Sequence, residues 1–157
     1  MERVNKILKN KKYIECLEKL QKHEENRIFC NHTLEHFLDM SRIAYIMVLE
    51  KNLNYSKEVI YAIGLLHDIG RVDQYEKGIE HHIASYNIAK EILEDIDFQH
   101  YEKEIILDGI KNHRNGEAED LNSIIYKSDK LSRPCYKCKA EKECNWPLEK
   151  KNLEIKY

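Results

Sequence analysis

The sequence has few of the residues that interrupt helices, with 5 Gly and 2 Pro among 157 residues. This scarcity argues against a loop-rich all-β fold and against a collagen-like repeat. Disorder is excluded by a composition of 42% hydrophobic residues, because such a chain can bury a core. A chain of this length is also too short for two ordinary domains. We therefore expect one predominantly helical domain.

The chain also lacks an excess of charge, a long apolar run and a secretion signal. Its formal net charge of -2 does not suit a nucleic-acid-binding protein or a polybasic membrane anchor. The apolar run from Ala44 to Leu49 is far shorter than the roughly 20 residues that cross a bilayer. The first residues, MERVNKILKNKK, contain no apolar signal core. We expect a cytoplasmic protein that binds neither nucleic acid nor membranes.

The spacing of apolar residues predicts six helices, at about 4–21, 31–49, 57–68, 81–96, 101–112 and 120–131. Together they predict an all-α fold, an irregular helical bundle formed by residues 1–134 as a single domain. Residues 135–157 are a short, polar, Cys-rich tail that cannot build a core of its own. We expect this tail to pack back onto the bundle.

Eight His residues are many for this length, and several lie at the ends of predicted helices. His67 and Asp68 close the apolar run YAIGLL, where an imidazole nitrogen and a carboxylate oxygen can turn toward one cation. His32 and His36 are four residues apart and so face one side of a helix. Further candidates lie in or beside other predicted helices: His81, His82, His113 and Asp129. A bundle could bring these groups together in its interior to bind metal.

Residues 67–70 read HDIG, preceded by His36 in HFLDMSRIA and followed by SDKL, which contains Asp129. In this order the segments resemble the HD-domain superfamily of metal-dependent phosphohydrolases, over residues of about 30–133. The resemblance implies that His36, rather than His32, is the first metal ligand. It also implies that His67 and Asp68 follow as ligands and that Asp129 is the last.

The resemblance extends to the HD subfamilies that hold two metals. His81, with Ser85 four residues later, resembles the extra His of those subfamilies, and His113 at the end of ILDGIKNH resembles the next one. His82 remains the alternative to His81. The six implied ligands of a binuclear centre are His36, His67, Asp68, His81, His113 and Asp129. This set is similar to that of the bacterial HD-domain diadenosine tetraphosphatases. The missing GYP motif separates the chain from the cyclic-dinucleotide phosphodiesterases.

Such a centre suits the cleavage of a phosphoester or phosphoanhydride. Two cations about 3.5 to 4 Å apart lower the pKa of a bridging water and hold the phosphoryl oxygens. We expect Asp68 to bridge two divalent transition metals, for which Fe, Mn, Co, Ni and Zn all suit the mixed ligands. Arg71 and Lys130 are expected to neutralise phosphate charge, with Arg114 and Arg133 as weaker candidates. We therefore expect a phosphohydrolase of a small phosphorylated substrate such as a nucleotide, acting as a monomer or homodimer.

The tail contains three thiols within ten residues, at Cys135, Cys138 and Cys144. Because the chain shows no signal for secretion, its odd number of five Cys favours reduced thiols or metal ligands over disulfides. Cys30 could complete a second metal site of four thiolates for structural Zn or an iron-sulfur cluster. Cys16 is the alternative fourth ligand. A set of reduced thiols that binds no metal is the alternative interpretation.

Two other functions fit the same residues. The first is a regulatory protein that binds metal or a nucleotide at the HD site without turnover and senses redox state or metal through its cysteines. The second is a di-iron oxygenase, because some HD proteins use a pair of irons to activate oxygen. Hydrolysis, loss of response on Cys135→Ser and oxygen consumption would distinguish the three.

Overall fold

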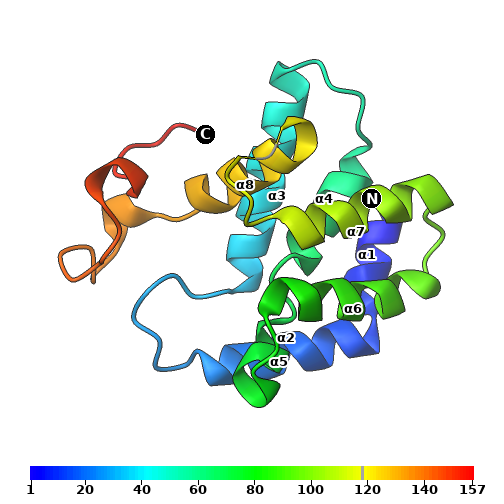
Figure 1. Cartoon of the computed structure of the whole chain (residues 1–157), viewed down its shortest axis with the longest axis horizontal. Helices are drawn as coiled ribbons and strands as arrows, with labels where there is room; N and C mark the ends of the chain where they lie inside the picture. The colour runs from blue at the N-terminus through cyan, green and yellow to red at the C-terminus, as the bar shows by residue number, and fades with distance from the viewer. Residues whose placement is uncertain (118) are drawn as a thin grey trace.

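The computed structural model describes residues 1–117 and 119–157, and within them the chain is all-α, with no strand. The helices pack as an irregular bundle, from which the tail extends at one end (Figure 1). Their bounds are α1 (Glu2–Lys9), α2 (Lys11–His23), α3 (Leu34–Glu50), α4 (Lys57–Leu66), α5 (Arg71–Lys77), α6 (His81–Glu94), α7 (His100–Asn112) and α8 (Asp120–Leu131). The predicted fold class is confirmed. No described helix has the length and hydropathy that a membrane span requires.

The predicted helix over 4–21 is wrong in one respect, because Asn10 divides it into α1 and α2. The backbone of Asn10 is extended, with φ -68° and ψ 128°, so it cannot continue the first helix. Its side chain accepts hydrogen bonds from the amides of Lys12 and Tyr13, at 2.9 and 3.2 Å, and thereby caps α2. The apolar spacing continues across this break, which is why periodicity alone predicts one helix.

The core is centred on α3 and α4, which pack against each other, while α3 also contacts α8 and α4 contacts α7. Phe37 and Met40 of α3 and Ile63 and Leu66 of α4 are fully buried. Burial of each such side chain stabilises the fold by about 1.5 to 3 kcal/mol. The bundle thus holds the C-terminal end of α4, which leads into the HDIG segment, in a rigid position.

Gly70 brings the HDIG segment into direct contact with the start of α6. The Gly70 amide donates a hydrogen bond to Ser85 Oγ at 2.8 Å. A Cβ at this position would lie 2.1 Å from the Ser85 amide nitrogen and 2.7 Å from the His81 carbonyl oxygen. Only glycine permits this backbone-to-backbone approach, and it fixes His81 at the N-terminal end of α6 relative to Asp68.

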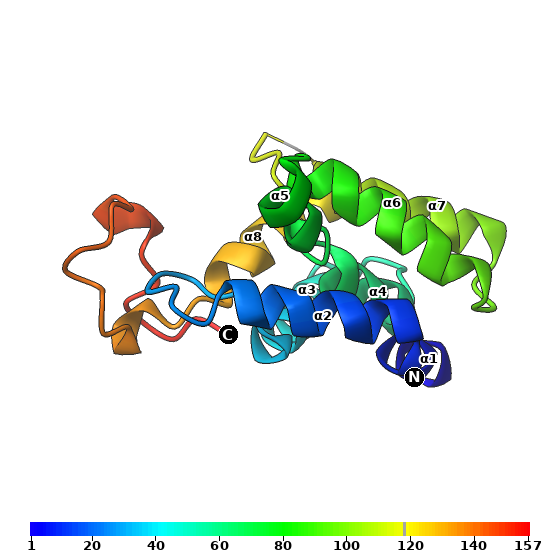
Figure 2. The ribbon, with the colours of Figure 1, turned by 90° about the horizontal axis from the view of Figure 1, so that it is seen from below.

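The tail contains two 3-10 helices, η1 (Cys135–Lys137) and η2 (Leu148–Lys150). Asn152 ties it to the end of α8, because its side-chain amide donates to the carbonyl oxygens of Leu131 and Arg133, at 2.6 and 3.2 Å. Arg133 in turn donates to the Asn31 carbonyl at 2.8 Å. The tail therefore lies beside the loop that joins α2 to α3 (Figure 2).

Candidate metal centre

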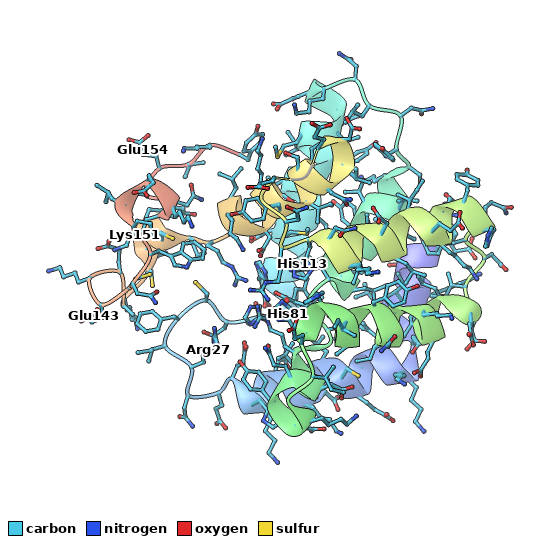
Figure 3. All side chains as sticks on the ribbon, in the orientation of Figure 1. Arg27, His81, His113, Glu143, Lys151 and Glu154 are labelled. Carbon is cyan, nitrogen blue, oxygen red and sulfur yellow. The ribbon has the colours of Figure 1, made fainter. Side chains whose placement is uncertain are left out.

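Helix ends from five segments bring His and Asp side chains together in the interior. His36 lies in the first turn of α3, and His67 and Asp68 directly follow α4. His81 begins α6 and His113 follows α7, and their side chains point toward one another from adjacent helices (Figure 3). Asp129 lies in the last turn of α8. The six side chains are all buried.

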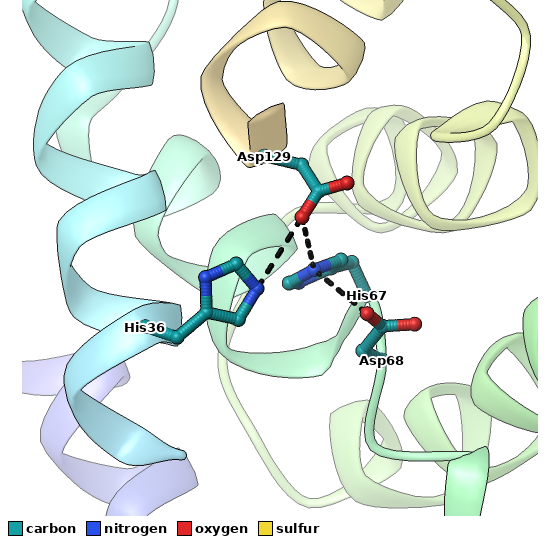
Figure 4. Close-up of side chains that lie close together, drawn as sticks. All are labelled: His36, His67, Asp68 and Asp129. Carbon is teal, nitrogen blue, oxygen red and sulfur yellow. Dashed lines mark ion pairs between the residues drawn. The ribbon is translucent and has the colours of Figure 1, made fainter. Parts of the chain in front are cut away.

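The side chains form two groups whose ligand atoms lie within 4.8 Å of one another. The first group contains His36, His67, Asp68 and Asp129 (Figure 4). His36 Nε2 and His67 Nε2 lie 3.3 and 3.8 Å from Asp129 Oδ1. The first group is therefore compact enough to surround one cation.

The second group contains Asp68, His81 and His113, so Asp68 belongs to both groups. Its Oδ2 atom lies 3.4 Å from His67 Nε2, in the first group. Its Oδ1 atom lies 3.3 Å from His81 Nε2 and 3.6 Å from His113 Nε2. Asp68 thus presents one oxygen to each group, which is the arrangement that a carboxylate bridging two metals requires.

Hydrogen bonds on the outer side fix which nitrogen each imidazole offers to the centre. His67 Nδ1 donates to the Gly64 carbonyl at 2.8 Å, and His113 Nδ1 donates to the Ile110 carbonyl at 2.7 Å. A carbonyl only accepts, so each Nδ1 carries a hydrogen and each Nε2 is the atom that faces inward, where a metal would bind in place of a proton. The Ser132 hydroxyl donates its hydrogen to the Asp129 carbonyl at 2.8 Å, so it accepts a hydrogen bond from His36 Nδ1 at 2.9 Å.

Several inward-facing atoms have no hydrogen-bond partner within the described part of the chain: His36 Nε2, His67 Nε2, Asp68 Oδ1 and His81 Nε2. Buried polar atoms without a partner are costly, and nitrogen and carboxylate oxygen atoms are the donors that divalent transition metals accept. The residues therefore fit a metal at each group.

The pKa values of the clustered histidines and aspartates are shifted by burial and by one another. Burial lowers the pKa of His36 to about 3 and that of His81 to about 3, so both imidazoles are neutral and able to bind metal. Burial also lowers the pKa of His67, but the carboxylates of Asp68 and Asp129 outweigh it and raise the value to about 9. Burial would raise the pKa values of both carboxylates, but the neighbouring histidines outweigh it and lower them. The two ionised carboxylates thus attract a cation to this point.

Cationic side chains surround the centre. Arg71 Nε lies 3.1 Å from Asp68 Oδ1, and Lys130 Nζ lies 2.5 Å from Asp129 Oδ2. The cavity in front of the centre has a volume of about 480 Å³ and is lined by the positively charged Arg27, Arg71, Arg114, Lys130 and Arg133. Phe29 and Trp146 contribute aromatic rings to the same lining. The cavity thus combines positive charge with flat apolar surface beside the centre.

His32 is a further component, which sequence reasoning set aside in favour of His36. It is 3% exposed, and its Nε2 lies 3.4 Å from Asp68 Oδ2. Its Nδ1 pairs at 2.6 Å with the carboxylate of Glu24, which also accepts a hydrogen bond from Tyr75 at 2.8 Å. Burial lowers the pKa of His32, so the neutral ring directs a lone pair at Asp68. The spacing of His32 and His36 in the sequence indicated that they could share a site. No sequence feature near Glu24 indicated that it contacts His32.

His82 takes a different position from His81. Its Nε2 lies 3.5 Å from Glu80 Oε2, and its side chain is 23% exposed. The structure thus brings His81, and not His82, to Asp68.

The cysteines do not form a group as compact as those around Asp68. Among the described residues, the groups with ligand atoms within 4.8 Å contain no cysteine. Cys30 nevertheless lines the cavity of the metal centre together with Cys144. It also lines a neighbouring cavity of about 310 Å³ together with Cys135 and Cys138. Cys16, on α2, lines a separate cavity.

Comparison with known protein families identifies the domain that contains this centre. The sequence matches the HD domain over residues 33–134. The chain belongs to the HD-domain family. HD domains bind divalent metals and define a superfamily of metal-dependent phosphohydrolases. The matched range includes the two groups around Asp68, whereas Glu24, His32 and all five cysteines lie outside it.

A protein of Clostridium beijerinckii is 47% identical over 157 residues, which is 100% of both chains. Its description, "Uncharacterized protein", names no activity. The search of solved structures gave no significant match.

Proposed function

We propose that this HD-domain protein hydrolyses a phosphoester or phosphoanhydride bond of a small phosphorylated compound with two divalent transition metals at its centre. The observation that carries the proposal is the placement of Asp68, which offers Oδ2 to the group of His36, His67 and Asp129 and Oδ1 to that of His81 and His113. A mononuclear site would use only the first group.

The metals, when bound, supply Lewis acidity and a water of lowered pKa. The chain's own residues orient the metal ligands and neutralise the charge of the phosphoryl group. The outer hydrogen bonds of His36, His67 and His113 keep their lone pairs directed inward. Arg71 and Lys130 lie at the two acidic ligands, where they can neutralise the charge that develops on a phosphoryl group. Asp68, Arg71 and Lys130 are thus the proposed catalytic residues.

His32 is the proposed further ligand on the side of the first group. Its neutral Nε2 and Asp68 Oδ2 are both acceptors, so their 3.4 Å approach favours a shared cation between them. The pairing of Glu24 with His32 Nδ1 resembles the carboxylate-histidine pairs that orient metal ligands in proteins.

A nucleotide is the substrate class that the cavity favours. Its arginines and Lys130 complement phosphate groups, while Phe29 and Trp146 offer faces on which a base can stack. Its volume of about 480 Å³ falls within the roughly 300 to 1,000 Å³ typical of small-molecule sites. We propose diadenosine tetraphosphate as the first compound to test, with mononucleotides as the simpler alternative.

The test is phosphate or nucleotide release from diadenosine tetraphosphate, nucleoside triphosphates and p-nitrophenyl phosphate by protein loaded with Mn, Fe, Co, Ni or Zn. Asp68→Asn should lower the rate by more than about 100-fold, because it removes the charge of the bridging ligand. His100→Ala is the matched control, since the His100 side chain is 89% exposed and is not part of the cavity lining. Metal-loaded protein that hydrolyses none of these compounds would contradict the proposal, and oxygen consumption would favour an oxygenase instead.

A further inference from the structure

The tail of residues 135–157 has an ordered path but no hydrophobic core. The buried hydrophobic residues of the described chain all lie between Val4 and Ile125. Leu148 and Ile155 in the tail are 71% and 76% exposed, and its buried residue is the polar Asn152. Segments that cannot bury apolar surface depend on another cross-link, such as a disulfide or a bound metal. We therefore expect the tail to be stabilised by a cross-link in addition to side-chain packing.

Four half-buried thiols line two adjoining cavities where the tail passes the loop between α2 and α3. Cys30, in that loop, is shared by two adjoining cavities, one of which also contains Cys144 and the other Cys135 and Cys138. The loop and the tail approach each other on the same side of the molecule, where Arg27 and Glu143 mark them in Figure 3. Cys30 is therefore the residue outside the tail that shares a cavity with each of the three tail thiols.

The backbone and the charges at Cys30 support this arrangement. Its φ of 45° lies in the left-handed region, which is uncommon for a residue other than glycine and tends to occur where the surroundings fix a side chain. Burial raises the pKa of the Cys30 thiol, Arg133 lowers it, and the thiols of Cys135, Cys144 and Cys138 raise it. Arg133 lines both cavities together with Cys30, so the loop thiol and the tail thiols share one cationic neighbour.

We propose that Cys30, Cys135, Cys138 and Cys144 bind a structural zinc ion that ties the tail to the loop between α2 and α3. Four cysteine sulfurs are a complete tetrahedral zinc set, and each thiol releases its proton to solvent as its sulfur binds the ion. The three tail sulfurs lie in short backbone turns, in which the amide of Cys138 donates to the Cys135 carbonyl at 3.1 Å and that of Cys144 donates to the Glu141 carbonyl at 3.3 Å.

The basic side chains around the thiols offset the negative charge of a zinc ion bound by four thiolates. Arg133 lines both of the cavities that Cys30 lines. The pKa of Lys151 is raised by its hydrogen bond to Glu141 and further by Cys144 and Cys135. Cationic surroundings of this kind favour the thiolate form that zinc binds.

The zinc site would also secure one wall of the cavity at the HD centre. Cys144 is followed in the chain by Asn145 and Trp146, which line that cavity. The Trp146 ring centroid lies 5.9 Å from Lys130 Nζ, and Lys130 contacts Asp129. The zinc-binding role itself is independent of the proposed hydrolysis, and only this consequence for the cavity depends on it.

Metal analysis of variants tests the proposal. Trp146 is the chain's single Trp, so its fluorescence reports the tail alone. We expect about one zinc ion per chain that Cys30→Ser and Cys138→Ser lose and that Cys16→Ser and Asp68→Asn keep. Titration of zinc-free protein with Co²⁺ should produce a thiolate-to-cobalt absorption band and shift the Trp146 emission together. Unchanged zinc content in Cys30→Ser or Cys138→Ser would overturn the proposal.

A second measurement avoids variants that fail to fold. Alkylation of the native wild-type protein, mapped by mass spectrometry, should spare the four proposed ligands until a zinc chelator exposes all four together. Cys16 should react at the same rate before and after chelation. Independent reaction of the four thiols, or a disulfide between Cys135 and Cys138 in protein purified under reducing conditions, would also overturn the proposal. Asp68→Asn separates the two proposals, because it disables the HD centre while leaving the thiol site intact.

Discussion

Replacing Gly70 with alanine tests the contact that places the HDIG segment against α6. The added Cβ would lie 2.1 Å from the Ser85 amide nitrogen and 2.5 Å from the Ala84 carbonyl carbon. Because both atoms belong to the backbone, no side-chain rotation relieves the clash, and α6 must move away by roughly 1 Å. Overpacking of this kind costs about 1 to 3 kcal/mol, and loss of the Gly70 hydrogen bond to Ser85 adds about 1 kcal/mol.

We therefore expect Gly70→Ala to lower the free energy of unfolding by about 2 to 4 kcal/mol, which lowers the melting temperature by roughly 10 °C for a domain of this size. The shift should also carry His81 away from Asp68, so the protein should retain metal at the group of His36 and Asp129 and lose it at the group of His81. Differential scanning calorimetry and elemental analysis measure the two effects.

Gly78→Ala is the matched control. Gly78 has a φ of 70°, but a Cβ there would meet nothing within 4 Å, so its substitution strains only the local backbone, by about 1 kcal/mol. This variant should keep the full metal content. If Gly70→Ala melts like the wild type and binds as much metal, the close approach does not position His81, and the reasoning is refuted.

Three further predictions concern the centre and its supports. Glu24→Gln should weaken metal retention by about 10- to 100-fold in competition with a chelator, because it removes the charged partner of His32, and unchanged retention would exclude that role. Lys130→Ala should lower kcat/KM of the hydrolysis by about 100-fold at unchanged metal content, and equal kinetics would exclude contact with the phosphoryl group. Burial raises the pKa of Glu24, but hydrogen bonds from His32 lower it to about 2. Since the folded value lies below the ordinary 4.5, the stabilisation is present above pH 4.5 and is lost toward pH 2, and melting curves of Glu24→Gln should show less of this loss.

The sequence was sufficient to predict most helices, because long amphipathic segments repeat their apolar residues clearly. The prediction over 120–131 coincides with α8, and that over 57–68 ends two residues beyond α4. Helix α5 was not predicted, since it has seven residues, of which Val72 is the buried one, and so carries no periodic signal. The prediction that His32 shares a helix with His36 was wrong, because Thr33 caps α3 after His32.

The candidate metal ligands were accessible from sequence through their order along the chain, which the HD motif marks. The contacts that support them were not, because they join distant segments. Tyr75 reaches Glu24 from 51 residues away, and Ser132 reaches His36 from 96 residues away. Local spacing contains no information on such pairs, whose partners are determined by how α2, α3, α5 and α8 pack.

That Asp68 joins two metal sites is tested most directly by anomalous X-ray diffraction from crystals of the metal-loaded protein. We expect two anomalous peaks per chain, about 3.5 to 4 Å apart, each beside a different oxygen of Asp68. One peak should lie between His36, His67 and Asp129, and the other between His81 and His113. A single peak at the first group in fully loaded protein, with His81 and His113 not coordinated, would contradict a binuclear centre.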